Sequence, residues 1–145
     1  EGVQNMVNNE TLINVLKEMN EQGKYIIPID PKLTDYENHL NYAYDDHHMR
    51  KLRVERLQNG EAISTAPKAN TVRSISRVRV IQDQDNEIVL RCAQNLREFR
   101  KENLKHYTAD VTYHLVRDQD GLKINRKIIN LVNSTDTLAG ISYIL

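Results

Sequence analysis

The sequence has one cysteine, no tryptophan, one phenylalanine and no excess charge of either sign. Because Cys92 has no second cysteine to pair with, the chain can form neither an internal disulfide nor a thiolate metal site, which excludes a secreted disulfide scaffold and a zinc ribbon. Its 20 Lys and Arg residues are balanced by 20 Asp and Glu residues, whereas binding to a phosphate backbone needs a basic field. We therefore expect no nucleic-acid partner.

Long apolar runs are also missing from the sequence. No stretch approaches the about 20 uncharged apolar residues of a membrane-spanning helix, and the start of the chain does not resemble a signal peptide. We therefore expect a cytoplasmic protein without a membrane partner. The length of 145 residues favours one domain over residues 1–145, and because the sequence begins with Glu1 rather than Met, we expect its N-terminal helix to be truncated.

The N-terminal part of the sequence predicts a short helix followed by a short strand. Thr11–Glu21 places apolar side chains at helical spacing, and Gly23 supplies an end to this amphipathic helix. Tyr25–Ile27 is an apolar run, which Pro28 limits to an edge strand or a short ladder. Asp30–Tyr44 has neither the helical nor the strand period, so we expect a loop that can end in a short strand.

A second helix is predicted from Asp45 and Asp46 to Gln58. The two carboxylates can cap its N-terminus and interact favourably with its dipole, and Asn59 with Gly60 can end it. Its apolar residues fall roughly on one face, which leaves the charged side chains available to water.

From Thr71 onward the apolar residues alternate with a period of two. Four long segments follow this period: Thr71–Gln82, Glu87–Lys101, Leu104–Arg117 and Leu122–Asn133. Their connections are short enough for hairpins, so the strands are expected to be antiparallel, and Ile141–Leu145 is a plausible last strand. Helices followed by a long meander are typical of an α+β domain, here two or three helices across one face of a strongly curved antiparallel sheet of four to six strands.

An ordered series of motifs is more specific than this pattern. The motifs are Tyr25-Ile26-Ile27-Pro28, Tyr44-Asp45-Asp46, Arg53-Val54-Glu55-Arg56, Ser76-Arg77-Val78-Arg79-Val80, Arg97-Glu98-Phe99-Arg100 and Gly121-Leu122-Lys123-Ile124-Asn125. In order and spacing, from about Leu16 to the end, they resemble the small (β) subunit of aromatic-ring-hydroxylating dioxygenases.

The resemblance implies a cystatin-like cone of the nuclear transport factor 2-like, or SnoaL-like, superfamily. It also implies a non-catalytic structural subunit that takes part in the catabolism of aromatic compounds and has no cofactor of its own. Its expected partners are copies of itself and a large (α) subunit, which holds the Rieske iron–sulfur cluster and the catalytic iron. The sequence agrees, because a Rieske cluster needs two Cys ligands and Cys92 is the only cysteine.

The alternative is a stand-alone SnoaL-like dehydratase or isomerase, or a small-ligand-binding protein, that forms a homodimer or homotrimer. Such an enzyme needs a His or a carboxylate inside an apolar cavity. His48 is the candidate base, with Asp45 or Asp46 as its orienting partner. A metal site at these positions is disfavoured, because consecutive residues at a helix start point in different directions.

Alternating arginines mark a further candidate site, a subunit interface. Arg73, Arg77 and Arg79 alternate on one predicted strand, so we expect them on one face of the sheet. They can form cross-strand pairs with acidic residues, or a polar interface that uses planar guanidinium hydrogen bonds. Tyr42 and Tyr44 are either interface anchors or core residues.

The segment Leu104–Arg117 indicates which face of the sheet is buried. Its odd-numbered positions from Tyr107 to Leu115 are the more apolar set, so this face is predicted to be the interior. The same alternation places His114 on the outside. Cys92 alternates with Leu90 and is predicted to be a small core residue rather than a nucleophile.

Overall fold

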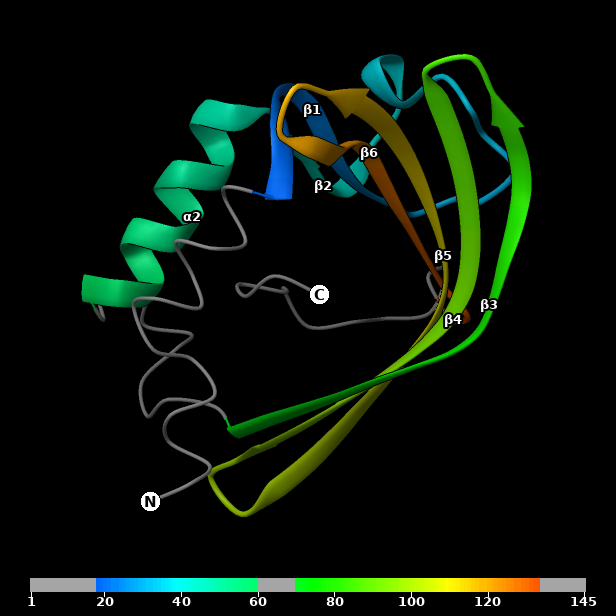
Figure 1. The fold of residues 1–145 in the computed structure, drawn as a ribbon. Helices are drawn as coiled ribbons and strands as arrows, with labels where there is room; N and C mark the ends of the chain where they lie inside the picture. The colour runs from blue at the N-terminus through cyan, green and yellow to red at the C-terminus, as the bar shows by residue number, and fades with distance from the viewer. Residues whose placement is uncertain (1–17, 60–69, 134–145) are drawn as a thin grey trace.

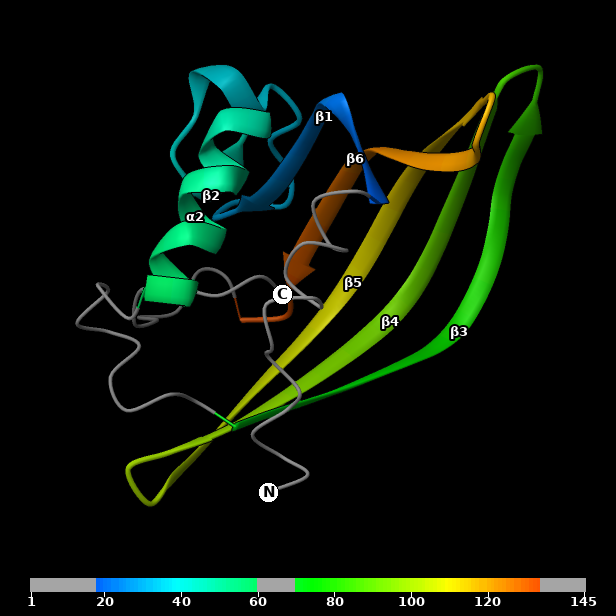
Figure 2. The ribbon, with the colours of Figure 1, turned by 60° about the vertical axis from the view of Figure 1, so that its left-hand side comes forward.

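The computed structural model describes residues 18–59 and 70–133, which form one curved sheet of six strands with a helix opposite its concave face (Figure 1). The elements in chain order are β1 (Met19–Pro28), η2 (Tyr36–Asn38), β2 (Asn41–Asp45), α2 (His47–Asn59), β3 (Asn70–Gln84), β4 (Glu87–Arg100), β5 (Asn103–Asp118) and β6 (Gly121–Leu131). The strand order is β2-β1-β6-β5-β4-β3. Figure 2 shows that β3, β4 and β5 extend well beyond β1, β2 and α2.

The long meander from β3 to β6 confirms the strand segments and hairpins predicted from the period of two. Each hairpin has two connecting residues, as the terminal pairs Gln84↔Glu87, Arg100↔Asn103 and Asp118↔Gly121 show. In the middle hairpin, Lys101 and Glu102 both have positive φ angles, of 50° and 61°, which match the twist of the strands that they join.

The first strand differs from the prediction in extent and position. Met19–Glu21 belongs to β1, so the predicted end of the first helix is wrong, while residues 11–17 lie outside the described residues. β1 is an internal strand: it pairs with β2 in antiparallel and with β6 in parallel orientation, each through a short ladder. The sheet is therefore mixed rather than wholly antiparallel.

Gly23 lies inside β1 and does not end a helix. It is located where the β1–β6 register shifts, between Met19 and Lys24. A Cβ at this position would lie 2.9 Å from the carbonyl oxygens of Asn20 and Asn125. The close approach of two backbone segments, rather than a helix C-cap, explains this glycine.

The second helix confirms one of its two predicted capping residues. Asp46 accepts a hydrogen bond through Oδ1 from the backbone N–H of Met49, at 2.9 Å, which is the N-cap arrangement. Asp45 instead belongs to β2, the short strand that ends the preceding loop as predicted. The predicted strand Ile141–Leu145 lies outside the described residues.

The core covers the concave face of the sheet. Tyr107, Ala109 and Val111 of β5 are buried there, as predicted, and we call this the inner face. Cys92 is buried on the same face, which confirms its core position. His114 lies on the opposite, outer face, where its Nδ1 is 2.9 Å from Oε1 of Glu87.

Candidate functional site: a cavity on the inner face of the sheet

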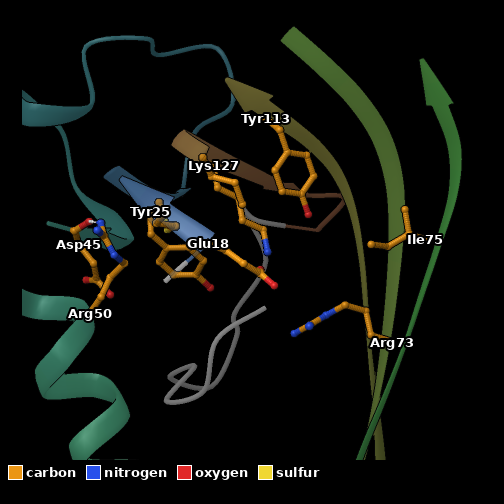
Figure 3. Close-up of a pocket in the computed structure, with 10 residues that line it drawn as sticks. Glu18, Tyr25, Asp45, Arg50, Arg73, Ile75, Tyr113 and Lys127 are labelled. Carbon is orange, nitrogen blue, oxygen red and sulfur yellow. Dashed lines mark hydrogen bonds between the residues drawn. The ribbon is translucent and has the colours of Figure 1, made fainter. Parts of the chain in front are cut away.

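A cavity of about 170 Å³ opens on the inner face of the sheet (Figure 3). Every strand except β4 contributes to its lining, as does α2. The lining residues are Glu18, Met19, Tyr25, Asp45, Arg50, Arg73, Ile75, Tyr113, Ile124 and Lys127. The curvature of the sheet therefore brings together residues from both ends of the described chain.

Lys127 lies between two tyrosine rings in this cavity. Its Nζ is 5.4 Å from the ring centroid of Tyr113 and 6.0 Å from that of Tyr25, both within the range of cation–π contacts. The strand register explains this arrangement: Lys127 of β6 is the cross-strand partner of Tyr25 in β1 and of Tyr113 in β5. Cross-strand partners share a face, so all three side chains lie on the inner face.

The surroundings of Lys127 disfavour its charged form. The pKa of Lys127 falls from 10.5 to about 7, first because the amine is buried and second because of the positive charge of Arg73, while the negative charge of Glu18 opposes the shift. Burial also raises the pKa of Tyr113 to about 12, so this phenol keeps its proton at neutral pH. The cavity thus contains an amine that changes charge near neutral pH beside a hydroxyl donor.

Two charged side chains at the α2 side of the cavity hold the fold together. The guanidinium of Arg50 donates to the carbonyl oxygens of Gly23, at 2.5 Å, and of Asn20, at 3.0 Å. Both carbonyls belong to the segment of β1 where the register with β6 shifts, so Arg50 provides hydrogen bonds in place of the regular ladder. Asp45 pairs with Nε of Arg53 at 2.7 Å.

The residues of the predicted acid/base pair are not brought together in the cavity. His48 is exposed on the first turn of α2 and does not line the cavity. Asp46 is also exposed. Its carboxylate accepts a hydrogen bond from the backbone N–H of Met49 at the helix start, and this hydrogen bond lowers the pKa of Asp46. Asp45 lines the cavity, but its carboxylate is paired with Arg53.

Sequence reasoning missed Lys127, which lines the cavity with its amine near the rings of Tyr25 and Tyr113. The β5–β6 hairpin contained a signal for this residue. The turn pairs Asp118 with Gly121, and continuing the ladder from that pair places Lys127 opposite Tyr113. This hairpin signal was not sufficient to predict the site, because the second ring, that of Tyr25, is placed beside Lys127 by a parallel pairing between segments about 100 residues apart.

The three arginines of β3 do not share one face of the sheet, contrary to the prediction. Arg73 pairs with Leu96 and points into the cavity, whereas Arg79 pairs with Arg91 on the outer face. The register shifts between Ser76 and Arg79, where Arg77 has a φ angle of 55°. One extra residue at such a bulge exchanges the two faces of the strand beyond it.

On the outer face, arginines surround Asp110. Nε of Arg91 donates to both carboxylate oxygens of Asp110, at 2.9 and 3.0 Å, and this pairing lowers the pKa of Asp110. Arg77 and Arg79 line the same shallow depression, of about 300 Å³. Together, Arg77, Arg79, Arg91 and Asp110 form what we call the arginine patch.

The two candidate anchor tyrosines lie in β2. Tyr42 packs against the buried core. The Oη of Tyr44 donates to Oε1 of Glu37 at 3.1 Å, and Nζ of Lys24 lies 5.9 Å from the Tyr44 ring centroid. Their role as interface anchors stays a prediction.

The described part of the chain contains neither a cluster of metal ligands nor a membrane-spanning helix. Within residues 18–59 and 70–133, no three His, Cys, Asp or Glu side chains converge to hold a metal ion. In the same residues, no helix is long and apolar enough to cross a membrane.

Comparison with known proteins relates this architecture to one family and several solved structures. A family model described as the ring hydroxylating beta subunit matches residues 5–137. The chain is similar to the beta subunit of benzoate 1,2-dioxygenase from Burkholderia mallei, with a TM-score of 0.75 and 17% identity over 97% of this chain and 89% of that one. It is also similar to a chain of naphthalene 1,2-dioxygenase with indole bound in the active site, with a TM-score of 0.77 and 14% identity over 97% and 79% of the two chains.

A third similar structure lies outside the dioxygenases by its description. It is a nuclear transport factor 2-like protein with a cystatin-like fold from Novosphingobium aromaticivorans, with a TM-score of 0.60 and 10% identity over 89% of this chain and 74% of that one. A search of curated protein sequences found no match.

These structural similarities confirm the predicted cystatin-like cone, and the family model, which spans nearly the whole sequence, confirms the resemblance seen in the motifs. The chain therefore belongs to the ring-hydroxylating beta subunit family.

Proposed function

We propose that this chain is the small, non-catalytic subunit of a Rieske-type aromatic-ring-hydroxylating dioxygenase. The observation that carries the proposal is the match of the ring hydroxylating beta subunit model to residues 5–137. Beta subunits of this family pair with alpha subunits. In the proposed complex, the large subunit holds the iron–sulfur cluster and the catalytic iron, since a chain with one cysteine cannot supply the two thiolates of a Rieske cluster.

The outer face of β3 and the edge of β3 that no described strand pairs with are the proposed contact surface. Among the described residues β3 is the last strand of the sheet, and three of its large apolar side chains that do not belong to the inner face are more than half exposed: Val72, Val78 and Ile81. A long apolar edge strand promotes pairing with another chain unless something covers it. The arginine patch adds planar hydrogen-bond donors beside this edge, which suits a polar rim around an apolar contact. Arg73 points inward and is not part of this proposed surface.

Co-expression of the tagged chain with a large-subunit gene from the same genome tests both parts of the proposal. We expect the two chains to elute together, with iron bound to the large one. Arg79→Glu should weaken the complex, while the same charge change at the exposed Lys32, on the loop after β1, should not. A chain that elutes only with itself and turns over a small substrate would contradict the assembly. An intact complex in the Arg79→Glu variant would contradict only the proposed surface.

The cavity favours a second candidate function, a stand-alone SnoaL-like enzyme or ligand-binding protein. Its support is a space of about 170 Å³ with an ionisable amine between two aromatic rings. Such a protein would work as a homodimer or homotrimer and would need no large subunit. In either case we retain the predictions of one domain and of a cytoplasmic location.

A further inference from the structure

We propose that the arginine patch binds a carboxylate side chain, an aspartate or a glutamate, on the surface of the large subunit. Arg77 and Arg79 hold this carboxylate, while Arg91 stays paired with Asp110. The inference rests on the proposed function and adds to it the chemistry of the partner at this contact. The large subunit then has an acidic position where this chain has a basic one.

Asp110 is fully engaged by one of the three arginines of the patch. Nε of Arg91 donates to both carboxylate oxygens, and Nη2 of Arg91 donates to Oδ2 as well. In the described part of the chain, the guanidiniums of Arg77 and Arg79 form neither a hydrogen bond nor an ion pair. Their positive charges nevertheless reach the depression, because they contribute to the lowered pKa of Asp110, whose main cause is the hydrogen bond from Arg91. The patch therefore has positive charge in excess, although the whole chain is neutral.

A strained bulge places these two guanidiniums on the outer face. Regular alternation from Arg73, which faces inward, would turn Arg77 and Arg79 inward as well. The register shift after Ser76 reverses their direction, and Arg77 adopts a φ angle of 55° there, a conformation that costs energy in a residue other than glycine. Bulges of this kind are enriched beside functional sites, because they re-aim side chains. The strain is explained if both guanidiniums serve a contact on the outer face.

The depression is too open to hold a free anion tightly. The side chains of Arg91 and Asp110 are 50% and 43% exposed, and Arg77 and Arg79 are exposed as well. A small anion bound here would stay hydrated, and exposed ion pairs contribute little free energy. The surface of a protein partner excludes this water, so a charge pair within a protein interface can contribute much more.

Apolar side chains beside the patch can provide this exclusion of water. Val78, between Arg77 and Arg79 in the sequence, is 61% exposed, and Val132, which lines the depression, is 75% exposed. Figures 1 and 2 show β3 at the side of the sheet away from α2, so the helix leaves this surface accessible. A partner that contacts the two valines brings its carboxylate to the arginines in a partly dry environment, the setting in which arginine contributes most to binding.

Charge favours the large subunit over a second copy of this chain as the occupant. Copies that met through this face across a twofold axis would place the same patch on both sides of the contact. The unpaired guanidiniums of Arg77 and Arg79 would then face each other, and like charges in an interface are destabilising. An acidic surface on a different chain has no such conflict.

Carbodiimide coupling, which joins an amine to a carboxylate in direct contact with it, identifies the occupant. The Arg79→Lys variant keeps the positive charge and introduces an amine into the patch. In the co-expressed complex, we expect this amine to form an amide with an aspartate or glutamate of the large subunit, detected by mass spectrometry of the digested complex. Arg56→Lys, at an exposed position of α2, is the control and should give no such amide with the large subunit.

The Arg79→Gln variant measures what the charge contributes to affinity. Dilution of the purified complex should give a Kd about thirtyfold higher or more, as for truncation of one partner of a desolvated charge pair. Lys32→Gln, at an exposed position on the loop after β1, should change the Kd by less than about threefold. Added NaCl should weaken the unmodified complex more than the Arg79→Gln complex, since one ion pair is missing from the variant.

The inference is wrong if the new amine in the Arg79→Lys complex couples only to Asp110 of its own chain, only to a second copy of this chain, or to no carboxylate. It is also wrong if Arg79→Gln leaves the Kd unchanged. In all of these results the complex still forms, so the proposed function stands. Failure of the unmodified chain to co-elute with the large subunit refutes the proposed function and this inference together.

Discussion

Replacing Lys127 with Met should stabilise the fold at neutral pH, and this gain should fade as the pH rises. In the unfolded chain the lysine binds its proton up to a pKa of 10.5, whereas in the folded chain it does so only up to about 7. Between these values the unfolded state holds more protons, so unfolding takes up a proton and the stability of the unmodified protein rises with pH. The methionine variant lacks this dependence.

The size of the effect follows from the pKa shift. Each pH unit within the interval contributes about 1.4 kcal/mol, so the variant's advantage should shrink by about 3 kcal/mol between pH 7 and pH 9.5. This is an upper limit, because the Lys127 side chain is only partly buried by surface area and water in the cavity lowers the desolvation penalty. Loss of the contacts with the two tyrosine rings offsets part of the gain at every pH.

Urea unfolding at four pH values from 7 to 9.5 measures the effect through the free energy of unfolding. The protein concentration is kept constant, since association would shift the apparent stability. Lys105→Met controls for the loss of one lysine charge from an exposed strand position. A stability difference between Lys127→Met and the unmodified protein that stays the same at all four values would refute the inferred environment of this amine.

Further predictions concern the junction between β1 and α2 and the buried thiol. Arg50→Met should lower the free energy of unfolding, measured in urea, by about 2–5 kcal/mol, because the buried carbonyls of Asn20 and Gly23 lose a charged donor. The control Arg56→Met, at an exposed position of the same helix, should change this free energy by less than about 0.5 kcal/mol. Gly23→Ala should lower the free energy of unfolding by about 2–3 kcal/mol, since its Cβ would lie 2.9 Å from the Asn20 oxygen, and an unchanged thermal midpoint would contradict this close approach. Cys92 should react with a thiol reagent only as fast as the chain opens, because the thiol is buried and burial raises its pKa, and fast labelling of the native chain would contradict its core position.

Local patterns predicted much of the fold. The period of two and the short polar connections predicted the four-strand meander, since each hairpin depends on residues adjacent in the sequence. The alternation in β5 predicted the buried face, and Asp46 was one of two residues predicted to cap α2. These features depend on interactions within a few residues, which is the range over which a sequence pattern is informative.

Features that depend on register or on distant pairing escaped prediction. The bulge at Arg77 has no glycine to mark it, because a non-glycine residue adopts the positive φ angle there, so Arg73 was expected on the same face as Arg79. The parallel pairing of β1 with β6 joins the two ends of the described chain and leaves no periodic signal. Gly23 consequently resembled a helix end, although it allows two backbones to approach closely.

The sequence by itself determined the family and the order of the elements, because both are carried by the identity and spacing of residues along the chain. Only the tertiary structure decided what the inner face can do. Lys127 has an ordinary side chain on an ordinary strand until the curvature of the sheet places it between Tyr25 and Tyr113, near the charge of Arg73. Desolvation and electrostatic interactions depend on distances through space, and those distances exist only once the sheet has closed around the cavity.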